Sequence, residues 1–244
     1  MSKIISFGKS DVGLRRSNNE DTFIVRPDLG FAAVADGMGG PASGEVASRI
    51  FADTALEIFS SNSERSEREL PGLVQDVFQL SNERIISIAQ DDPRNHGMGC
   101  TAEVITFYSE GYVAGHVGDS RTYLLREGKF RQISKDHSVV QDQLDQGLIK
   151  PDEARNHALK HVILRAVGVK EDLAVDIIRG KTMPGDIFLL CSDGLTDMLE
   201  DAEIHKVLML PLDLEQKADR LIDLAKAAGG KDNITVALCE VIAS

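Results

Sequence analysis

Four aspartates at the edges of apolar runs could together form one chemical site. They are Asp36, Asp119, Asp193 and Asp232, and most of them lie next to glycine. A single Asp-Gly pair is the commonest hairpin-turn signal, so one instance alone indicates only a turn. Four such acids are harder to explain as turns. If they converge, their carboxylates repel one another unless cations bind between them.

The chemistry that such a cluster supports is metal-assisted hydrolysis. Oxygen ligands without a histidine pair favour Mg²⁺ or Mn²⁺ over Zn²⁺, and the Gly37 carbonyl beside Asp36 adds one more hard donor. Two such ions about 3.5–4 Å apart can activate a water for in-line attack on phosphorus. Arg16 offers a planar fork for phosphate oxygens, although an ordinary ion pair with Glu20 or Asp21 is the alternative.

Strands and helices that could position these acids are visible as periodic apolar patterns. Amphipathic helices are predicted at 44–60, 70–88 and 214–228, from apolar residues at i, i+3, i+4 and i+7. A hairpin turn is predicted within 124–130. Runs of strand length, bounded by glycine or acidic turns, occur at 22–25, 31–35, 102–108, 112–117, 122–125, 174–178, 187–191 and 234–242.

The order of these elements predicts an α+β protein. Strict βα alternation, which is typical of a parallel sheet, is missing, so hairpin-linked strands should form an antiparallel core with helices outside it. The strand over 31–35 should stop at Asp36, before a glycine-rich turn at 37–40. The polar segment 138–168 should be an insertion over the surface without a core of its own. Residues 1–244 are then expected to form a single domain.

Composition excludes several classes of protein. The net charge is -12, from 39 acidic and 27 basic residues, which disfavours nucleic-acid binding. No apolar run approaches the roughly 20 residues of a membrane span, and the first residues lack the apolar core of a signal peptide, so we expect a cytoplasmic protein without membrane association. Cys100, Cys191 and Cys239 lie far apart in apolar surroundings and are expected to be reduced and packed.

The sequence resembles the metal-dependent Ser/Thr protein phosphatases of type 2C, the PPM family, in their bacterial form. Six motifs carry the resemblance, in the family's order and across nearly the whole chain. They are GLRRSNNED (13–21), DGMGG (36–40), GMGCT (97–101), VGDSR (117–121), CSDGL (191–195) and KDNITV (231–236). The resemblance implies a central sandwich of two antiparallel sheets with a helix pair on each outer face, in α-β-β-α layers. It also implies that 138–168 is the family's flap.

The resemblance further implies a site with two Mg²⁺ or Mn²⁺ ions at one end of the sandwich. Asp36 should bridge the two ions and act in catalysis, Asp193 and Asp232 should complete the first ion's ligands, and the Gly37 carbonyl should bind the second. Glu20 should act through metal-bound water.

Three more residues acquire roles from the resemblance. Asp21 should lie behind the ligands, in the second shell. Asp119, together with Asp193, should hold a third, weakly bound ion. Arg16 should bind the substrate's phosphate and act in catalysis.

The activity implied is hydrolysis of phosphoserine and phosphothreonine in proteins by a hydroxide that bridges the metals, without a phosphoenzyme. The substrates would be proteins phosphorylated by a bacterial Ser/Thr kinase, and the enzyme would be a monomer. Two alternatives stay open: a phosphatase for small phosphoesters or sigma-factor regulators on the same fold, and a non-catalytic module that binds phosphoproteins. All the matching acids are present, which favours an active enzyme.

Three positions depart from the family's pattern. Met38 stands where many eukaryotic members have a histidine proposed as general acid, so no general acid can be named. Cys100 replaces a usual threonine, and Ala158 follows His157 where a proline is common. His157 and His161 are expected to be structural or exposed.

Two rival enzyme classes are disfavoured. Residues 37–42 satisfy the dinucleotide fingerprint G-x-G-x-x-[GA], but Asp36 would face the pyrophosphate, and no second strand ends in an acid about 20 residues later. A cysteine-dependent phosphatase is excluded because no cysteine is followed by an arginine six residues on.

Overall fold

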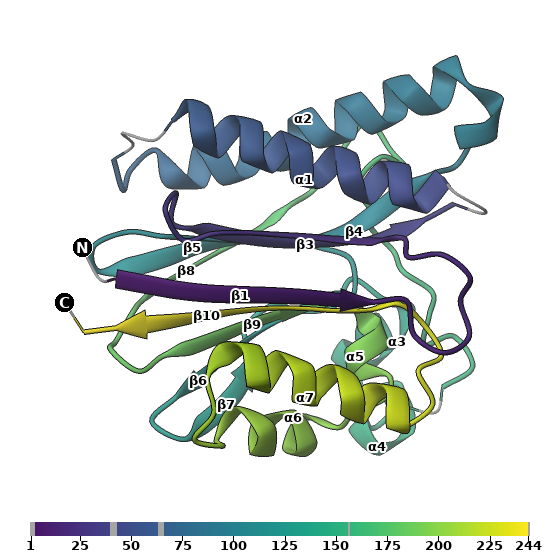
Figure 1. Ribbon diagram of the computed structural model, residues 1–244. Helices are drawn as coiled ribbons and strands as arrows, with labels where there is room; N and C mark the ends of the chain where they lie inside the picture. Colours follow the sequence, from purple (N-terminus) through teal and green to yellow (C-terminus); the bar gives the residue numbers. More distant parts are fainter. Residues whose placement is uncertain (1–2, 40–42, 63–65, 156, 244) are drawn as a thin grey trace.

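Two five-stranded antiparallel sheets lie face to face in this computed structural model, which describes residues 3–39, 43–62, 66–155 and 157–243 (Figure 1). The first sheet has the order β1-β10-β9-β6-β7 and the second has β2-β3-β4-β5-β8. The first sheet's strands are β1 Lys3–Asp11, β10 Ile234–Ile242, β9 Ile187–Cys191, β6 Arg121–Arg126 and β7 Lys129–Gln132. The second sheet's strands are β2 Asp21–Arg26, β3 Phe31–Met38, β4 Gly99–Phe107, β5 Gly111–Val117 and β8 Asp176–Lys181.

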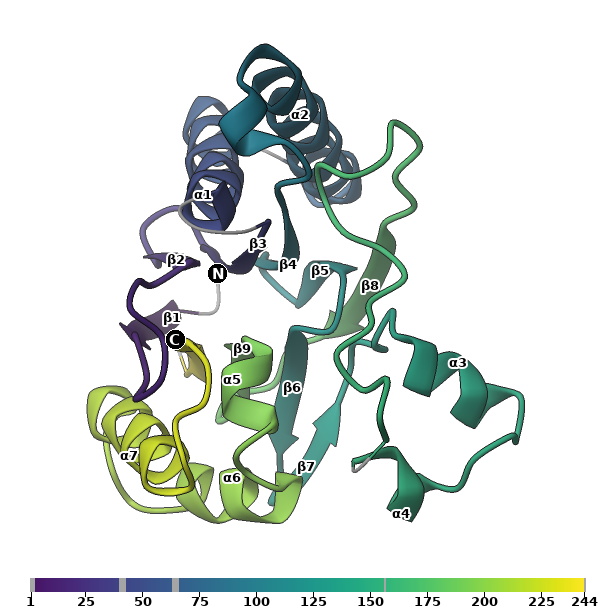
Figure 2. The same cartoon turned by 90° about the vertical axis from the view of Figure 1, so that its right-hand side faces the viewer.

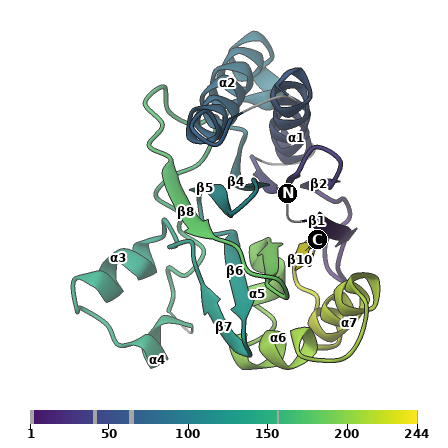
Figure 3. The same ribbon diagram turned by 90° about the vertical axis from the view of Figure 1, so that its left-hand side faces the viewer.

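A pair of helices covers the outer face of each sheet (Figures 1 and 3). Helices α1 Ser43–Ser61 and α2 Leu70–Asp91 pack on the second sheet, and α6 Asp201–Leu208 and α7 Leu214–Ala227 pack on the first. The predicted α-β-β-α sandwich is therefore confirmed. Within the described residues, no helix has the length and apolar character needed to cross a membrane.

Three apolar layers hold the sandwich together, one under each helix pair and one between the sheets. Phe188 is fully buried between the sheets, where its ring packs edge-on against Phe107 at 5.3 Å and Tyr112 at 4.8 Å. Burial of an aromatic ring of this size contributes about 1.5–3 kcal/mol, so these layers fix the two sheets rigidly against each other. The ends of the sheets are thereby held in register.

The remaining helices are short and lie near one end of the sandwich. They are the 3₁₀ turn η1 Pro93–Asn95 and the helices α3 Val139–Asp145, α4 Pro151–Ala154 and α5 Asp193–Thr196. Helices α3 and α4 project to one side of the sandwich in Figures 2 and 3. They belong to the segment 138–168, for which we keep the name flap. An isolated bridge joins Ser138 to Ile163 within the flap, and a second one attaches Val167 to Cys100 of the body.

The structure corrects the sequence prediction in three places. Strand β3 continues past Asp36 to Met38, because β4 pairs with it as far as Gly99. Strand β1, the edge strand of the first sheet, and the eight-residue helix α6 were not predicted. The glycine-rich turn expected at 37–40 lies partly outside the described residues: Gly37 and Met38 belong to β3, Gly39 follows the strand, and the gap begins at residue 40.

Candidate metal centre

The four aspartates singled out in the sequence lie together at one end of the sandwich. Asp36 comes from β3, Asp119 follows β5, Asp193 follows β9, and Asp232 precedes β10. All four line one cleft of about 810 Å³. Acids almost two hundred residues apart in the sequence are therefore brought into one pocket by the antiparallel sandwich, whose strand ends meet there. Other residues lining the cleft are Arg15, Arg16, Glu20, Gly37, Met38, Lys160, His161, Asp197 and Lys231.

Asp36 and Asp21 face each other on neighbouring strands. They are directly paired in the register of β2 and β3. The Asp21 side chain is buried behind the cleft, where its Oδ2 accepts a hydrogen bond from Ser192 Oγ at 2.7 Å. Asp21 is thus placed behind the carboxylates that line the cleft.

Gly37 allows a helix to approach the strand that carries Asp36. A Cβ at Gly37 would lie 2.0 Å from the Gly44 carbonyl oxygen and 2.6 Å from the Glu20 carbonyl oxygen. No side chain fits into that space, so only glycine permits the start of α1 to pack here. The Gly37 N–H donates to the Glu20 carbonyl at 3.1 Å, which fixes Glu20 beside the strand.

Asn233 joins the loop before β10 to the segment before β2. Its Oδ1 accepts from the Glu20 N–H at 2.8 Å, and its Nδ2 donates to the Val12 and Asn18 carbonyls at 3.0 and 2.9 Å. The sequence analysis gave Asn233 no role, although its position directly after Asp232 marked it. Asn233 holds Glu20 and Asp232 in one arrangement although 212 residues separate them.

The electrostatics of this cleft favour a bound cation. Burial, followed by repulsion from Asp21 and Asp193, raises the pKa of Asp36 well above its usual range. Burial, followed by repulsion from Asp119, likewise raises the pKa of Asp193 well above its usual range. Burial raises the pKa of Asp21 and of Asp119 to about 6. The environment that the protein itself provides therefore disfavours ionisation of these aspartates.

One buried oxygen supports the same conclusion. Asp21 Oδ1 is buried and has no hydrogen-bond partner among the described residues. A buried carboxylate oxygen without a donor is costly, and a nearby divalent cation would offset that cost. The donor set consists of carboxylates and a carbonyl, which suits Mg²⁺ or Mn²⁺.

Arg16 contacts one of the clustered acids directly. Its Nη2 donates to Asp232 Oδ2 at 2.7 Å. The alternative considered from the sequence was an ion pair of Arg16 with Glu20 or Asp21, and the structure shows a different partner. The guanidinium lies at the mouth of the cleft, half exposed, where a phosphate group could exchange with the carboxylate.

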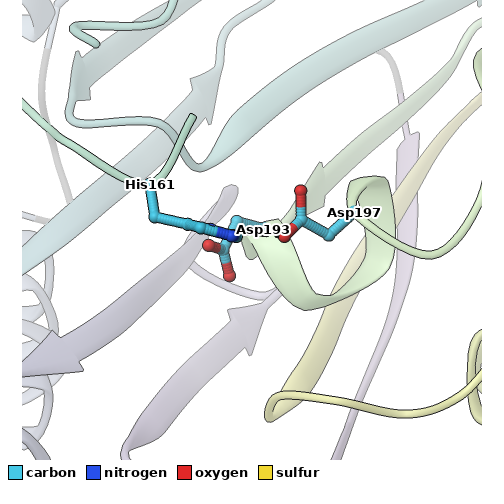
Figure 4. Close-up of side chains that lie close together, drawn as sticks. All are labelled: His161, Asp193 and Asp197. Atoms are coloured by element: carbon cyan, nitrogen blue, oxygen red, sulfur yellow. Dashed lines mark ion pairs between the residues drawn. The ribbon is translucent and has the colours of Figure 1, made fainter. Parts of the chain in front are cut away.

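The sequence analysis missed a further acid, Asp197. Asp197 lies one helical turn after Asp193. The possible ligand atoms of Asp193, Asp197 and His161, which comes from the flap, all lie within 4.8 Å of one another (Figure 4). We expected His161 to be structural or exposed, and the structure shows it exposed. Its Nδ1 lies 3.4 Å from Asp197 Oδ2. Lys160 Nζ donates to Asp197 at 3.0 Å. Asp197 thus ties the flap to the edge of the cleft.

Comparison with known proteins supplies the family. The family model described as "Protein phosphatase 2C" matches residues 15–238. The chain is 37% identical over 239 residues to the serine/threonine phosphatase stp of Listeria innocua, covering 95% of this chain and 94% of that protein. It is 37% identical over 234 residues to the serine/threonine protein phosphatase PstP of Mycobacterium tuberculosis. That match covers 96% of this chain but 44% of PstP, so the chain spans less than half of that relative.

Solved structures agree with the sequence matches. The crystal structure of the Mycobacterium tuberculosis phosphatase PstP/Ppp superposes with a TM-score of 0.92 at 35% identity, covering 98% of this chain and 99% of that chain. A PstP catalytic domain in complex with two manganese ions gives a TM-score of 0.90, also at 35% identity, with the same coverage. The fold and the acidic cleft are those of a PPM-type phosphatase. The chain belongs to the protein phosphatase 2C family.

Proposed function

We propose that this chain is a metal-dependent protein phosphatase that hydrolyses phosphoserine and phosphothreonine. The observation that carries the proposal is the convergence of Asp36, Asp193 and Asp232 on one cleft beside Arg16. The relatives named as serine/threonine phosphatases span nearly the whole chain, which supports the same activity.

The acids of the cleft would hold two Mg²⁺ or Mn²⁺ ions. Asp36 would contact both, Asp193 and Asp232 would complete one ligand set, and the Gly37 carbonyl with Glu20 would serve the other. Two ions held in this way would supply an activated water and neutralise charge during in-line attack on phosphorus. Asp21 lies behind Asp36 and orients it through the paired strands.

Further residues of the cleft would act on the substrate. Arg16 would leave Asp232 and bind two phosphoryl oxygens with its planar fork. The thioether of Met38 carries no proton, so this side chain would not protonate the leaving serine or threonine oxygen. Asp119, with Asp193, would hold a third, weaker ion.

We also propose a domain organisation, a class of substrate and a cellular location for this enzyme. Residues 1–244 would act as one catalytic domain with the flap at 138–168 beside the cleft. The substrates would be proteins phosphorylated by a Ser/Thr kinase in the cytoplasm, and the enzyme would work as a monomer without membrane association. The net charge of -12 supports a soluble partner rather than a nucleic acid.

The proposal is tested by removal of the metals and of one ligand. We expect no hydrolysis of a phosphothreonine peptide in EDTA and recovery on addition of excess Mn²⁺. Asp193→Asn should lower kcat/KM by about 100-fold or more, because the neutral amide binds a divalent cation poorly. The matched control is Asp53→Asn, an exposed aspartate on α1 outside the cleft, which should behave like the wild type. Full activity after chelation would contradict the proposal.

A further inference from the structure

A buried polar network lies between the sheets, behind the cleft, and the proposed chemistry does not use it. Glu103 and His116 are fully buried, and Glu103 pairs with His116 Nδ1 and accepts a hydrogen bond from Thr122 Oγ1. His116 Nε2 donates to the Lys135 carbonyl at 2.7 Å. The ring of His137, only 8% exposed, lies 4.5 Å from the His116 ring, measured between centroids. None of these side chains lines the cleft.

His137 binds both backbone polar groups of Gly118. The backbone N–H of His137 donates to the Gly118 carbonyl at 2.6 Å, and the Gly118 N–H donates to the side-chain Nδ1 of His137 at 3.1 Å. Gly118 has a φ of +113°, and a Cβ there would lie 2.4 Å from Thr101 Cβ, so its backbone is tightly enclosed. The next residue is Asp119. The backbone and the side chain of His137 therefore together hold Gly118, the residue before Asp119.

The same histidine also holds the returning strand of the flap. The Leu164 N–H donates to the His137 carbonyl at 2.7 Å. On the far side of the ring, His137 Nε2 lies 3.3 Å from Asp176 Oδ2 and 3.0 Å from Arg165 Nη1 of the flap, and this Nη1 also donates to the other oxygen of Asp176 at 3.0 Å. The flap, strand β8 and the turn that carries Asp119 thus meet at a single residue.

The hydrogen bonds of this ring define the role of Nδ1. A backbone N–H can only donate, so Nδ1 accepts from Gly118, whereas Nε2 faces both the Asp176 carboxylate and the Arg165 guanidinium. Burial, followed by His116 and Arg165, lowers the pKa of His137 to about 4, which keeps the ring neutral and Nδ1 able to accept. The ring is therefore a fixed hydrogen-bonding bridge at neutral pH.

We propose that His137 is a positioning residue that couples the flap to Asp119, and through Asp119 sets the affinity of the third, weakly bound cation. The inference rests on the proposed function, in which Asp119 binds that cation. Loss of the Nδ1 acceptor would free the Gly118 N–H and loosen the turn before Asp119, whereas loss of Nε2 would release Arg165 of the flap. The two tightly bound ions, held by Asp36, Asp193 and Asp232, would remain.

Two near-isosteric variants separate this role from general packing. His137→Asn keeps an acceptor near the position of Nδ1, whereas His137→Gln places its amide near Nε2 and leaves the Gly118 N–H without a partner. We expect the Gln variant to bind the weak Mn²⁺ about 10-fold less tightly, since loss of a residue that orients a ligand typically costs 10–100-fold. The Asn variant should retain most of the wild-type affinity.

Two readouts do not depend on activity. Free Mn²⁺ is counted by electron paramagnetic resonance during a titration, which separates the weak ion from the two tight ones. Tryptic cleavage of the metal-free protein after Lys160 and Arg165 reports the attachment of the flap, and it should be faster in the Asn variant, which lacks the contact of Nε2 with Arg165, than in the Gln variant. In activity assays, the Gln variant should need more Mn²⁺ for half-maximal rate but reach a similar kcat.

A double variant tests whether the effect passes through Asp119. In an Asp119→Ala background, His137→Gln should change Mn²⁺ binding no further.

Equal behaviour of the Asn and Gln variants in both binding and proteolysis would overturn the inference. If the Gln variant fails to fold, loss of weak Mn²⁺ binding in the folded Asn variant would overturn it instead, and retention would support it. Absence of any EDTA-sensitive activity in the wild type would overturn the proposed function, while the tryptic comparison would still decide whether His137 attaches the flap.

Discussion

Arg16 is hydrogen-bonded to Asp232 across 216 residues of sequence, at 2.7 Å between Nη2 and Oδ2. Both side chains are partly exposed, at 49% and 35%. Pairs this exposed typically contribute about 0.2–1 kcal/mol, so the pair can separate when a cation binds Asp232 and a phosphate binds Arg16. Arg16, the proposed phosphate-binding group, therefore lies beside a candidate metal ligand.

Replacement of Arg16 should mainly weaken productive binding of phosphate. Hydrogen bonds to charged groups contribute about 1.5–3 kcal/mol, so Arg16→Ala should lower kcat/KM on a phosphopeptide about 10- to 150-fold. Arg16→Lys keeps the charge but loses the bidentate fork, and it should recover only part of this loss. Steady-state kinetics at saturating Mn²⁺ measure both effects. An unchanged kcat/KM in the alanine variant would assign Arg16 to structure alone.

Metal-free protein should become less stable as the pH rises. Burial raises the pKa of Asp21 and of Asp119 to about 6 in the fold, and the pKa values of Asp36 and Asp193 are also raised, well above their usual range. A group with a raised folded pKa contributes stability below its unfolded pKa, near 4, and that contribution is lost as the pH passes the folded value. Thermal melts of stripped protein should show a Tm lower by about 5–10 °C at pH 7.5 than at pH 5.5.

Asp193→Asn supplies the control for that dependence on pH. The amide removes one charge from the cluster, so the stripped variant should be more stable than the wild type at pH 7.5 and similar to it at pH 5.5. Asp53→Asn, on the exposed face of α1, should follow the wild type at both values. A stripped wild type that is equally stable at both pH values would show that the cleft acids do not repel one another.

The long elements and the acids could be predicted from the sequence because their patterns are local. Helices α1, α2 and α7 each repeat apolar residues over several turns. Strand β1 shows no such pattern, because its inward face carries Ser6, Gly8 and Ser10. A Cβ at Gly8 would lie 2.4 Å from the Phe23 ring, so the apolar group that fills this space comes from β2. The short helix α6 offers too few turns to reveal its period.

The part of the site that was not predicted depends on contacts between distant segments. The pairing of Arg16 with Asp232 arises only when β1 and β10 lie side by side. Asp197 carries no Asp-Gly signature, although its spacing of four from Asp193 places it one helical turn further on, which was the available signal. Long-range partners of this kind are set by the topology of the sheets.

The three cysteines should be inert in the folded protein. All are buried and free, and burial raises the pKa of Cys100 and Cys191 and brings that of Cys239 to about 12. Because the thiolate is the reactive form, a colorimetric thiol reagent should modify almost none of them in native protein and all three in 6 M guanidinium, roughly the concentration that unfolds most proteins. Treatment with iodoacetamide should leave phosphatase activity unchanged. Rapid inactivation of folded protein would indicate a cysteine-dependent reaction.

The ion pair between Lys160 and Asp197 should restrain the flap while adding little to stability. Both side chains are 29% exposed, so the pair contributes about 1 kcal/mol or less. Asp197→Asn should therefore shift the Tm by only about 2–4 °C. Yet it removes the negative charge and one of the two carboxylate oxygens that hold Lys160 and His161 at the cleft, so tryptic cleavage after Lys160 should accelerate several-fold.

The kinetic consequence of that change depends on substrate size. A flap that lies beside the cleft contacts a protein substrate more extensively than a small phosphoester, so Asp197→Asn should raise KM for a phosphoprotein more than KM for p-nitrophenyl phosphate. Asp219→Asn is a suitable control, because Asp219 also pairs with a lysine, Lys9, but on α7 away from the flap. Equal changes with both substrates would show that Asp197 acts on the cleft itself, because a group that only restrains the flap should discriminate between them.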